Sequence, residues 1–189
     1  MAAMRRFTEL YLALDATTKT KEKVAAMAAY FAAVEPGDGA WAVFFLSGRR
    51  PKRLLPSHLL RALAAEQAGL PDWLLGESYA AVGDSAEAAS LLLPDSGRST
   101  DLPLRYWIEQ RILPVRDLPE AEQRAAILSA WDELSESERY VFNKLITGAF
   151  RVGVSQLLLV RALTAVSGVD EQTISHRLMG AWDPTPAFY

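Results

Sequence analysis

The sequence predicts an all-α fold of about eleven helices, packed in two lobes with no significant sheet. Apolar side chains recur three and four residues apart along nearly the whole chain, which is the spacing of one helix face. Alanine and leucine, both strong helix formers, are abundant, and half of the residues are hydrophobic. The 189 residues suffice for one domain, or for two small lobes that share a core.

The first helices are separated by polar or glycine-rich turns. Residues 7–14 and 24–34 each carry an apolar stripe at helical spacing. The run Pro-Gly-Asp-Gly at 36–39 predicts a break in the chain. The apolar segment 41–46 fits a buried helix or a strand, and we favour a helix because no other segment offers a partner strand.

Later helices are marked by the residues that begin or end them. After a basic loop at 47–56, Ser57 is placed to cap a helix that ends near Gly69. Further helix starts are expected at Pro71, Asp84, Leu102, Pro119, Ser135, Ser155 and Asp170. The starts at Asp84 and Ser135 have a glutamate three residues later, as in a capping box. Residues 94–101 form the most linker-like stretch, so a seam between two lobes is expected there.

Composition excludes several classes of protein and site. There is no cysteine, which excludes disulfides and thiolate metal sites and fits a reducing cytoplasm. The two histidines, His58 and His176, lie far apart in the sequence, and no ligand spacing suggests zinc. The chain has no apolar run of eighteen residues and no secretory signal. We expect a cytoplasmic, nucleoid-associated monomer with no membrane contact.

Charge is unevenly distributed along the chain, although its sum is only −3. Residues 39–65 contain five basic residues and no acidic one, and residues 139–169 contain four basic residues and no acidic one. Residues 66–138 contain fifteen acidic and five basic residues, a net charge of −10. A fold that brings the two basic stretches onto one face would suit a polyanion. The alternative is an ordinary fluctuation of charge along a chain.

The segment 144–156 has the most informative pattern. Its two glycines, Gly148 and Gly153, allow a tight turn between helices. The helix that begins at Ser155 would direct its free N–H groups and its positive dipole end into this turn, which makes an anion site. Arg151 and Lys144 add full positive charge, so a phosphodiester is the favoured ligand. The alternative is a plain helix–helix connection in which Gly148 is only a C-terminal cap.

Two further segments are rich in positive charge. The loop at 49–53 holds four basic residues among five, and these repel one another unless an anion is near. Arginine in such a loop can bind two phosphate oxygens at once. The segment 17–23 places threonine hydroxyls and lysines at a helix start, which suits a phosphate backbone. A solvated loop and a simply capped helix are the alternatives.

No catalytic constellation is present in the sequence. The chain has neither a Gly-x-x-x-x-Gly-Lys-Ser/Thr phosphate loop nor a Gly-x-Ser-x-Gly nucleophile turn. Trp107 and Trp131 stand at helical spacing among aliphatic residues, so we interpret them as core residues and not as base-stacking platforms. We therefore predict no catalytic residue and no metal site.

These motifs resemble a known family along essentially the whole chain. The strongest likeness is at residues 144–155 (KLITGAFRVGVS), which are similar to the signature turn of the N-terminal DNA-binding domain of ATP-dependent DNA ligases. Residues 178–186 resemble the segment that leads into the nucleotidyltransferase domain of these enzymes. Residues 7–18 and 48–53 resemble the bacterial branch that is often found alongside a helicase and a nuclease.

The resemblance implies an all-α domain of two pseudo-symmetric lobes that lies across the minor groove of nicked duplex DNA. Full-length members use ATP and a divalent metal such as Mg²⁺ to adenylate a lysine in Lys-x-Asp-Gly, and then join the nick. None of the five lysines in this chain is followed by x-Asp-Gly. We therefore expect residues 1–189 to be the DNA-binding domain alone, without a cofactor and inactive by itself. The catalytic nucleotidyltransferase and OB domains are expected C-terminal to Tyr189.

The predicted DNA contacts combine the charge pattern with this resemblance. By the resemblance, the turn at 151–156 matches the phosphate-contacting turn of the family, and the loop at 49–53 would be a second contact. The predicted residues are Thr18, Lys19, Arg49, Arg50, Lys52, Arg53, Lys144, Arg151, Gly153, Ser155 and Gln156. The main alternative is a helical protein–protein interaction module with an apolar groove. A small stand-alone enzyme is disfavoured because no nucleophile–base pair is present.

Overall fold

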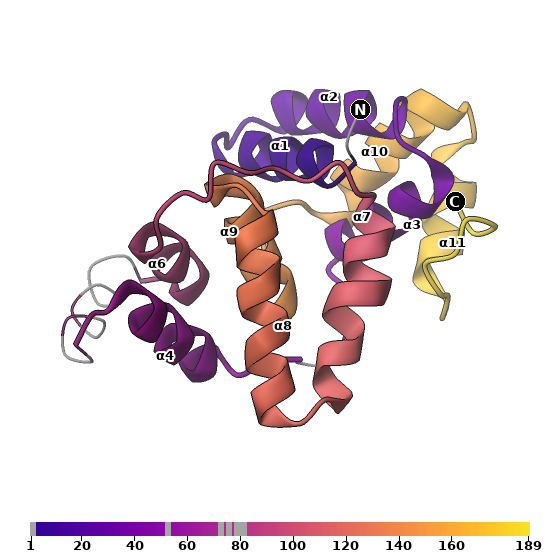
Figure 1. Cartoon of the computed structure of the whole chain (residues 1–189). Coiled ribbons are helices and arrows are strands. Elements are labelled where there is room, and N and C mark those ends of the chain that lie inside the picture. The colour runs from indigo at the N-terminus through magenta and orange to yellow at the C-terminus, as the bar shows by residue number, and fades with distance from the viewer. Residues whose placement is uncertain (1–2, 52–53, 72–73, 75–76, 78–82) are drawn as a thin grey trace. The chain divides into compact units, whose positions relative to one another are not determined.

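The computed structural model describes residues 3–51, 54–71, 74, 77 and 83–189 (Figure 1). These residues form ten α-helices and no strand, which confirms the all-α prediction and comes close to the expected eleven helices. The helices are α1 (Ala3–Asp15), α2 (Thr20–Phe31), α3 (Pro36–Leu46), α4 (Ser57–Ala68), α6 (Ser85–Leu92), α7 (Leu104–Tyr106), α8 (Glu120–Glu133), α9 (Glu136–Ile146), α10 (Gln156–Ser167) and α11 (Glu171–Met179). A π-helical turn, Trp107–Ile112, and a 3-10 turn, Leu113–Asp117, continue α7. The helix predicted from Pro71 falls largely outside the described residues.

Two compact units divide the chain. Unit 1 comprises residues 1–50, 102–105 and 151–189, and unit 2 comprises residues 51–101 and 106–150. The chain therefore passes between the units at four points of its sequence. None of the helices in the described part of the chain is both long and apolar enough to cross a membrane.

The linker-like stretch at 94–101 belongs to unit 2, where its polar groups are hydrogen-bonded. The Ser96 hydroxyl donates to the Leu134 carbonyl (2.8 Å), and the Ser99 hydroxyl donates to the Glu138 carboxylate (2.8 Å). The Thr100 amide donates to the same carboxylate (3.3 Å). Most residues of this stretch are exposed, but these hydrogen bonds hold it against unit 2.

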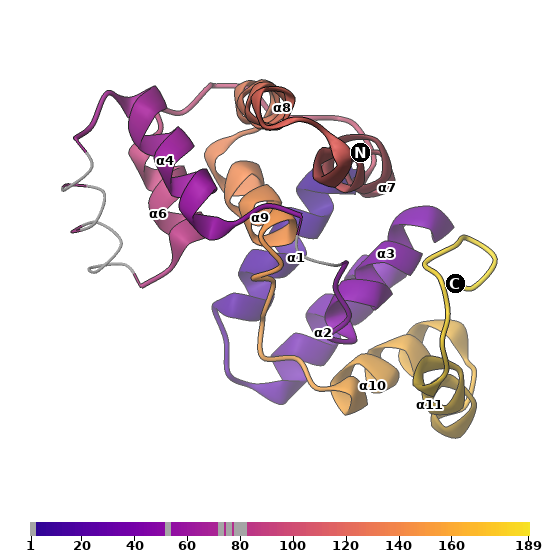
Figure 2. The same ribbon diagram turned by 90° about the horizontal axis from the view of Figure 1, so that it is seen from below.

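Unit 1 is built around α1, α2, α3, α10 and α11 (Figure 2). Helix α2 packs against both α1 and α10, and α10 also contacts α3 and α11. Phe7 of α1 and Tyr30 of α2 are buried and meet edge to face, with ring centroids 6.1 Å apart. Burying an aromatic side chain of this size contributes about 2 kcal/mol. The apolar stripes predicted for the first two helices contribute to this core.

The predicted break at residues 36–39 is wrong, because these residues form the first turn of α3. Pro36 suits this place, since the first helical residue needs no hydrogen-bonded N–H. The two glycines serve close packing. A Cβ on Gly37 would lie 2.8 Å from Cδ of Arg105, and a Cβ on Gly39 would lie 2.7 Å from the ring of Tyr189. Tertiary contacts therefore explain glycines that, by sequence alone, indicate a turn.

In unit 2, helix α6 packs against both α4 and α9. The predicted cap at Asp84 is confirmed: its carboxylate accepts from the amides of Ala86 (2.8 Å) and Glu87 (3.2 Å). The reciprocal bond from the Asp84 amide to the Glu87 carboxylate, which would complete a capping box, is not formed among the described residues. Ser135 forms the predicted capping box at the start of α9. The predicted cap at Ser57 is wrong, because α4 begins at Ser57 itself and the preceding proline holds the N-cap position.

Trp107 and Trp131 are core residues of unit 2, as predicted. Both are buried, and the indole N–H of each finds a buried acceptor. Trp107 donates to the Thr100 hydroxyl (3.2 Å), and Trp131 donates to the side-chain carbonyl of Asn143 (2.8 Å). A satisfied indole donor is the usual condition for burying tryptophan without a penalty.

Candidate nucleic-acid interface

The candidate site is the turn Arg151–Ser155, which precedes α10 in unit 1. Gly153 has a φ of +58°, a left-handed conformation that glycine adopts without strain. Ser155 is the N-cap of α10, and its hydroxyl accepts a hydrogen bond from the Leu158 amide (3.4 Å), as predicted. A glycine and a local cap thus place the amino end of a 12-residue helix at this turn.

The backbone amides of this turn are available to a ligand. Those of Gly153, Val154 and Ser155 donate no hydrogen bond to another described residue. Unpaired N–H groups at the amino end of a helix carry partial positive charge and favour an anion. Arg151 adds a formal charge: its side chain is exposed and has no hydrogen bond or ion pair with any described residue. Gln156, the first residue of α10, is also exposed.

Lys23 of α2 holds this turn from inside unit 1. Only 7% of Lys23 is exposed, and its ammonium donates to the carbonyl oxygens of Val152 (2.5 Å) and Gly153 (3.1 Å). The interpretation of residues 17–23 as a helix start that faces phosphate does not single out Lys23. Its spacing to the buried Met27 and Tyr30 is that of one helix face, and this periodicity is the signal that could have placed it inside.

The amino end of α2 lies beside the turn, because Lys23 belongs to the first turn of that helix. Thr18 and Lys19, both predicted contacts, stand just before this end and are exposed. The Lys19 ammonium pairs with Glu22 (2.8 Å), but an ion pair this exposed is weak and can open for another anion. The structure therefore brings Thr18 and Lys19 to the same end of unit 1 as the turn before α10.

Arg49 is engaged within unit 1. Its guanidinium donates to the carbonyls of Leu178 (3.2 Å) and Gly180 (2.5 Å) and lies 4.7 Å from the centre of the Trp182 ring. Arg49 thereby anchors the C-terminal segment, a role that the charge pattern does not predict. Arg50 is exposed. A DNA contact by either arginine stays a prediction, and Lys52 and Arg53 lie outside the described residues.

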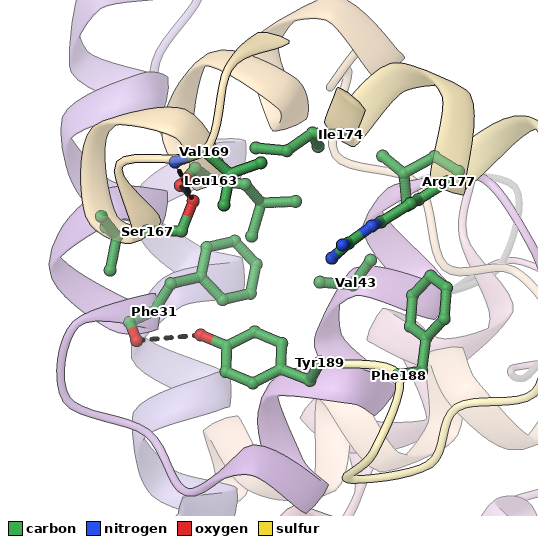
Figure 3. A pocket seen from close by; sticks show the side chains of 11 residues that line it. Phe31, Val43, Leu163, Ser167, Val169, Ile174, Arg177, Phe188 and Tyr189 are labelled. Carbon is green, nitrogen blue, oxygen red and sulfur yellow. Dashed lines mark hydrogen bonds between the residues drawn. The ribbon is translucent and has the colours of Figure 1, made fainter. Parts of the chain in front are cut away.

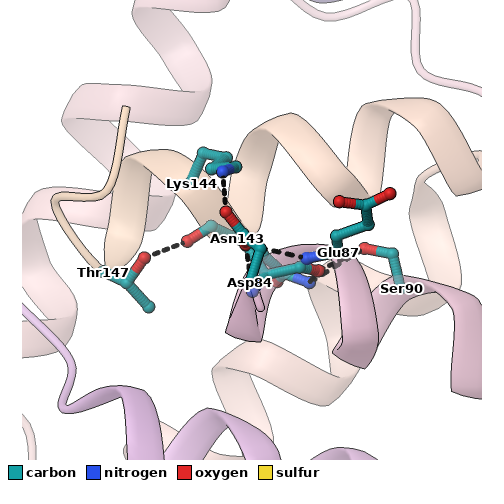
Figure 4. A network of polar contacts seen from close by, with 7 residues as sticks. Asp84, Glu87, Ser90, Asn143, Lys144 and Thr147 are labelled. Carbon is teal, nitrogen blue, oxygen red and sulfur yellow. Dashed lines mark hydrogen bonds and ion pairs between the residues drawn. The ribbon is translucent and has the colours of Figure 1, made fainter. Parts of the chain in front are cut away.

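Lys144 belongs to unit 2, where it is buried against α6 (Figure 4). Its ammonium forms an ion pair with Asp84, and it lies 5.3 Å from the centre of the Tyr140 ring. Burial alone would raise the pKa of Asp84. The hydrogen bond and charge of Lys144, with the amides of Glu87 and Ala86, outweigh burial and hold that pKa below its ordinary value. Because Asp84 neutralises the charge of Lys144, we do not include Lys144 in the candidate site.

The two units carry opposite net charges. Unit 1 has eleven basic and eight acidic residues, a net charge of +3, whereas unit 2 has nine basic and fifteen acidic residues, a net charge of −6. The predicted contacts Thr18, Lys19, Arg49, Arg50, Arg151, Gly153, Ser155 and Gln156 all lie in unit 1. The candidate site therefore lies in the unit whose overall charge attracts a polyanion.

Unit 1 also contains an apolar pocket of about 280 Å³ (Figure 3). Phe31, Val43 and Leu163 form part of its walls, and at its edge the Tyr189 hydroxyl donates to the Phe31 carbonyl (3.0 Å). Arg177 is the charged residue among the described residues that line it. The pocket offers no nucleophile with an adjacent base. Across the described part of the chain, no group of three or more acidic or histidine side chains could hold a metal.

The sequence was compared with protein-family models and with curated proteins. A family model described as DNA ligase N terminus matches residues 3–164. No curated protein matched the sequence. The matched range contains Lys23, the turn at Arg151–Ser155 and the amino end of α10, so it covers the candidate site.

Proposed function

Since the chain belongs to the family of DNA ligase N-terminal domains, we propose that it binds duplex DNA through the phosphate backbone and positions nicked DNA for a ligase catalytic domain. One observation carries the proposal: unpaired amides at the amino end of α10 lie beside the amino end of α2, with an exposed arginine at the turn. Two helix amino ends and Arg151 concentrate positive potential where a phosphate would bind.

The available groups favour binding without sequence preference. Backbone amides, hydroxyls and flexible positive side chains recognise phosphate oxygens, and base edges are read by other arrangements. The resemblance described above adds that the domain lies across the minor groove. We expect nicked and intact duplexes to bind with similar affinity, because chemistry at the nick belongs to the catalytic domain.

Fluorescence anisotropy with a nicked duplex across a salt series tests the proposal. The logarithm of the affinity should fall linearly with the logarithm of salt concentration, with a slope near −0.9 for each phosphate neutralised, and we expect roughly four to eight such contacts. Arg151→Ala should weaken binding about tenfold at low salt and make the slope shallower by about 0.9, equally for all DNA sequences.

Arg116→Ala is the matched control. Arg116 is also an exposed arginine, but it lies in the acidic unit 2 and pairs with Asp117 (3.1 Å). Its removal should leave affinity and slope unchanged. A wild-type affinity that does not respond to salt would contradict phosphate binding. An equal loss in Arg116→Ala and Arg151→Ala would contradict the placement of the site in unit 1.

A helical protein-interaction module is the second candidate function, and the apolar pocket of unit 1 favours it. Such a pocket can hold an apolar side chain of a partner. This candidate would be supported by a protein ligand whose binding is lost in Leu163→Arg, together with an absence of DNA binding by the wild type. Salt-dependent DNA binding that Leu163→Arg leaves intact would decide against it.

A further inference from the structure

We propose that Lys23 is a positioning residue for DNA binding: its ammonium turns the carbonyls of Val152 and Gly153 inward and so directs the following amides outward toward a phosphate. The proposal rests on the proposed function and deepens it. Lys23 itself is 7% exposed, so it acts through the turn and does not reach the DNA. Lys23 and the two carbonyls belong to unit 1, although about 130 residues separate them in sequence.

The planarity of the peptide bond links the two sides of the turn. In a trans peptide the C=O and the N–H point in opposite directions, and no cis peptide is found among the described residues. The carbonyl of Val152 points to Lys23, so the amide of Gly153 points away from it. The carbonyl of Gly153 does the same for the amide of Val154. Both amides are among those that donate no hydrogen bond to a described residue.

The partners of Lys23 are unusual for a buried lysine. Burying an ammonium is costly unless an opposite charge or several hydrogen bonds compensate for lost water. Lys23 has two carbonyl acceptors, and no carboxylate of the described residues pairs with it. Its charge is therefore only partly compensated. It polarises the two peptide groups, and their outward N–H ends become better donors to an anion.

Gly153 fits this arrangement in two ways. Its φ of +58° lies in the left-handed region, and a Cβ at this position would lie 3.1 Å from the Lys23 ammonium. A side chain would strain the backbone and crowd the ammonium against its acceptors. The glycine thus allows the lysine to approach the turn from behind.

The test compares Lys23→Met with Lys21→Met, the same substitution at an exposed site in the same helix turn. Methionine keeps the apolar stem of lysine but has neither charge nor N–H donor. Nicked-duplex affinity is measured by anisotropy across a salt series, and amide resonances of Gly153 and Val154 are followed by NMR. We expect Lys23→Met to lose about tenfold in affinity at every salt concentration, the size of one charge-assisted hydrogen bond.

The salt dependence of the affinity distinguishes a lysine that positions the turn from a lysine that contacts phosphate directly. Lys23→Met should keep the wild-type slope, because Lys23 neutralises no phosphate, and its Gly153 and Val154 resonances should no longer respond to DNA. Lys21→Met should keep both amide responses. A slope shallower by about 0.9 in Lys23→Met would overturn the proposal in favour of direct contact. Wild-type affinity in folded Lys23→Met would overturn it in favour of a purely structural lysine.

A second variant guards against a folding defect. If circular dichroism shows that Lys23→Met is unfolded, Lys23→Gln takes its place, since glutamine keeps a polar NH2 group without charge, and the same criteria apply. A wild type that fails to bind DNA would remove the proposed function and this inference together. A wild type that binds, with the folded Lys23 variant behaving like it, would remove this inference alone.

Discussion

The two units of this chain each bury a lysine ammonium, and they use it differently. Lys23 in unit 1 and Lys144 in unit 2 are each 7% exposed. Lys144 pairs with the carboxylate of Asp84, whereas Lys23 donates to two backbone carbonyls. In unit 2 the positive charge is neutralised within the protein. In unit 1 it is only partly compensated by peptide dipoles.

Whether a positive charge can attract DNA depends less on its place in the sequence than on the groups that neutralise it in the fold. Lys144 belongs to the segment that most resembles the family's turn, yet it lies in a unit of net charge −6 and is paired there. Lys23 is less conspicuous in sequence, yet it supports an open turn in a unit of net charge +3. An anion is expected where positive charge is left uncompensated.

Removal of the carboxylate that pairs with Lys144 in unit 2 should have the largest effect. Asp84→Ala leaves the Lys144 ammonium buried without its partner and removes the N-cap of α6, so we expect a loss of about 4 kcal/mol in the free energy of unfolding. Urea unfolding at neutral pH measures it. Asp84→Asn, which keeps an acceptor for the cap, should lose less. A loss below about 1 kcal/mol in Asp84→Ala would show that the ammonium is hydrated and not dependent on Asp84.

Removal of Lys144 itself should have a smaller effect on stability. Lys144→Met should cost less, about 2 kcal/mol, because the Asp84 side chain is 29% exposed and still accepts from two amides. The DNA affinity of the folded variant should stay unchanged, because in the wild type Asp84 already neutralises the charge of Lys144. Anisotropy over a salt series checks this. Weaker binding with a shallower salt slope would return Lys144 to the set of DNA contacts.

Sequence patterns predicted the elements whose causes are local. The caps at Asp84, Ser135, Ser155 and Asp170 are bonds to amides two or three residues ahead, and each was readable from residue type and spacing. The periodic apolar stripes likewise predicted the helices. The anion-favouring turn before α10 belongs to the same class, because a glycine and a serine cap define it locally.

Contacts between residues that are far apart in the sequence could not be predicted from residue type and spacing. Lys23 and Val152 are 129 residues apart, and Lys144 and Asp84 are 60 residues apart. Neighbouring residues in the sequence made both lysines look alike, as positive charges near a phosphate site. The prediction of a turn at Gly39 was wrong for the same reason. A glycine is needed there because the ring of Tyr189, 150 residues later, packs against it, and not because the chain turns. Charge compensation and close packing are properties of the tertiary fold.

A smaller test compares a buried carboxylate, Asp38, with a half-buried one, Asp84, because their pKa values are shifted in opposite directions. Asp38 of unit 1 accepts from the Arg105 amide (2.7 Å), but burial dominates and raises its pKa. The pKa of Asp84 in unit 2 is lowered. The pKa of an aspartate in an unfolded chain is about 3.9. Because the pKa of Asp38 is raised, the folded protein binds a proton there at a higher pH than the unfolded chain does. Because the pKa of Asp84 is lowered, the folded protein binds a proton there only at a lower pH than the unfolded chain does.

These shifts predict separate pH windows. As pH falls from neutral toward the pKa of an unfolded aspartate, about 3.9, the stability of the wild type should rise relative to Asp38→Asn, because protonation relieves the buried charge. As pH falls below about 4, the stability of the wild type should drop relative to Asp84→Asn, because the pairing with Lys144 is lost. Urea unfolding of the three proteins at several pH values resolves both differences. Parallel curves for the two variants would mean that the two carboxylates share one environment, and the contrast between the units would then fail for acidic groups.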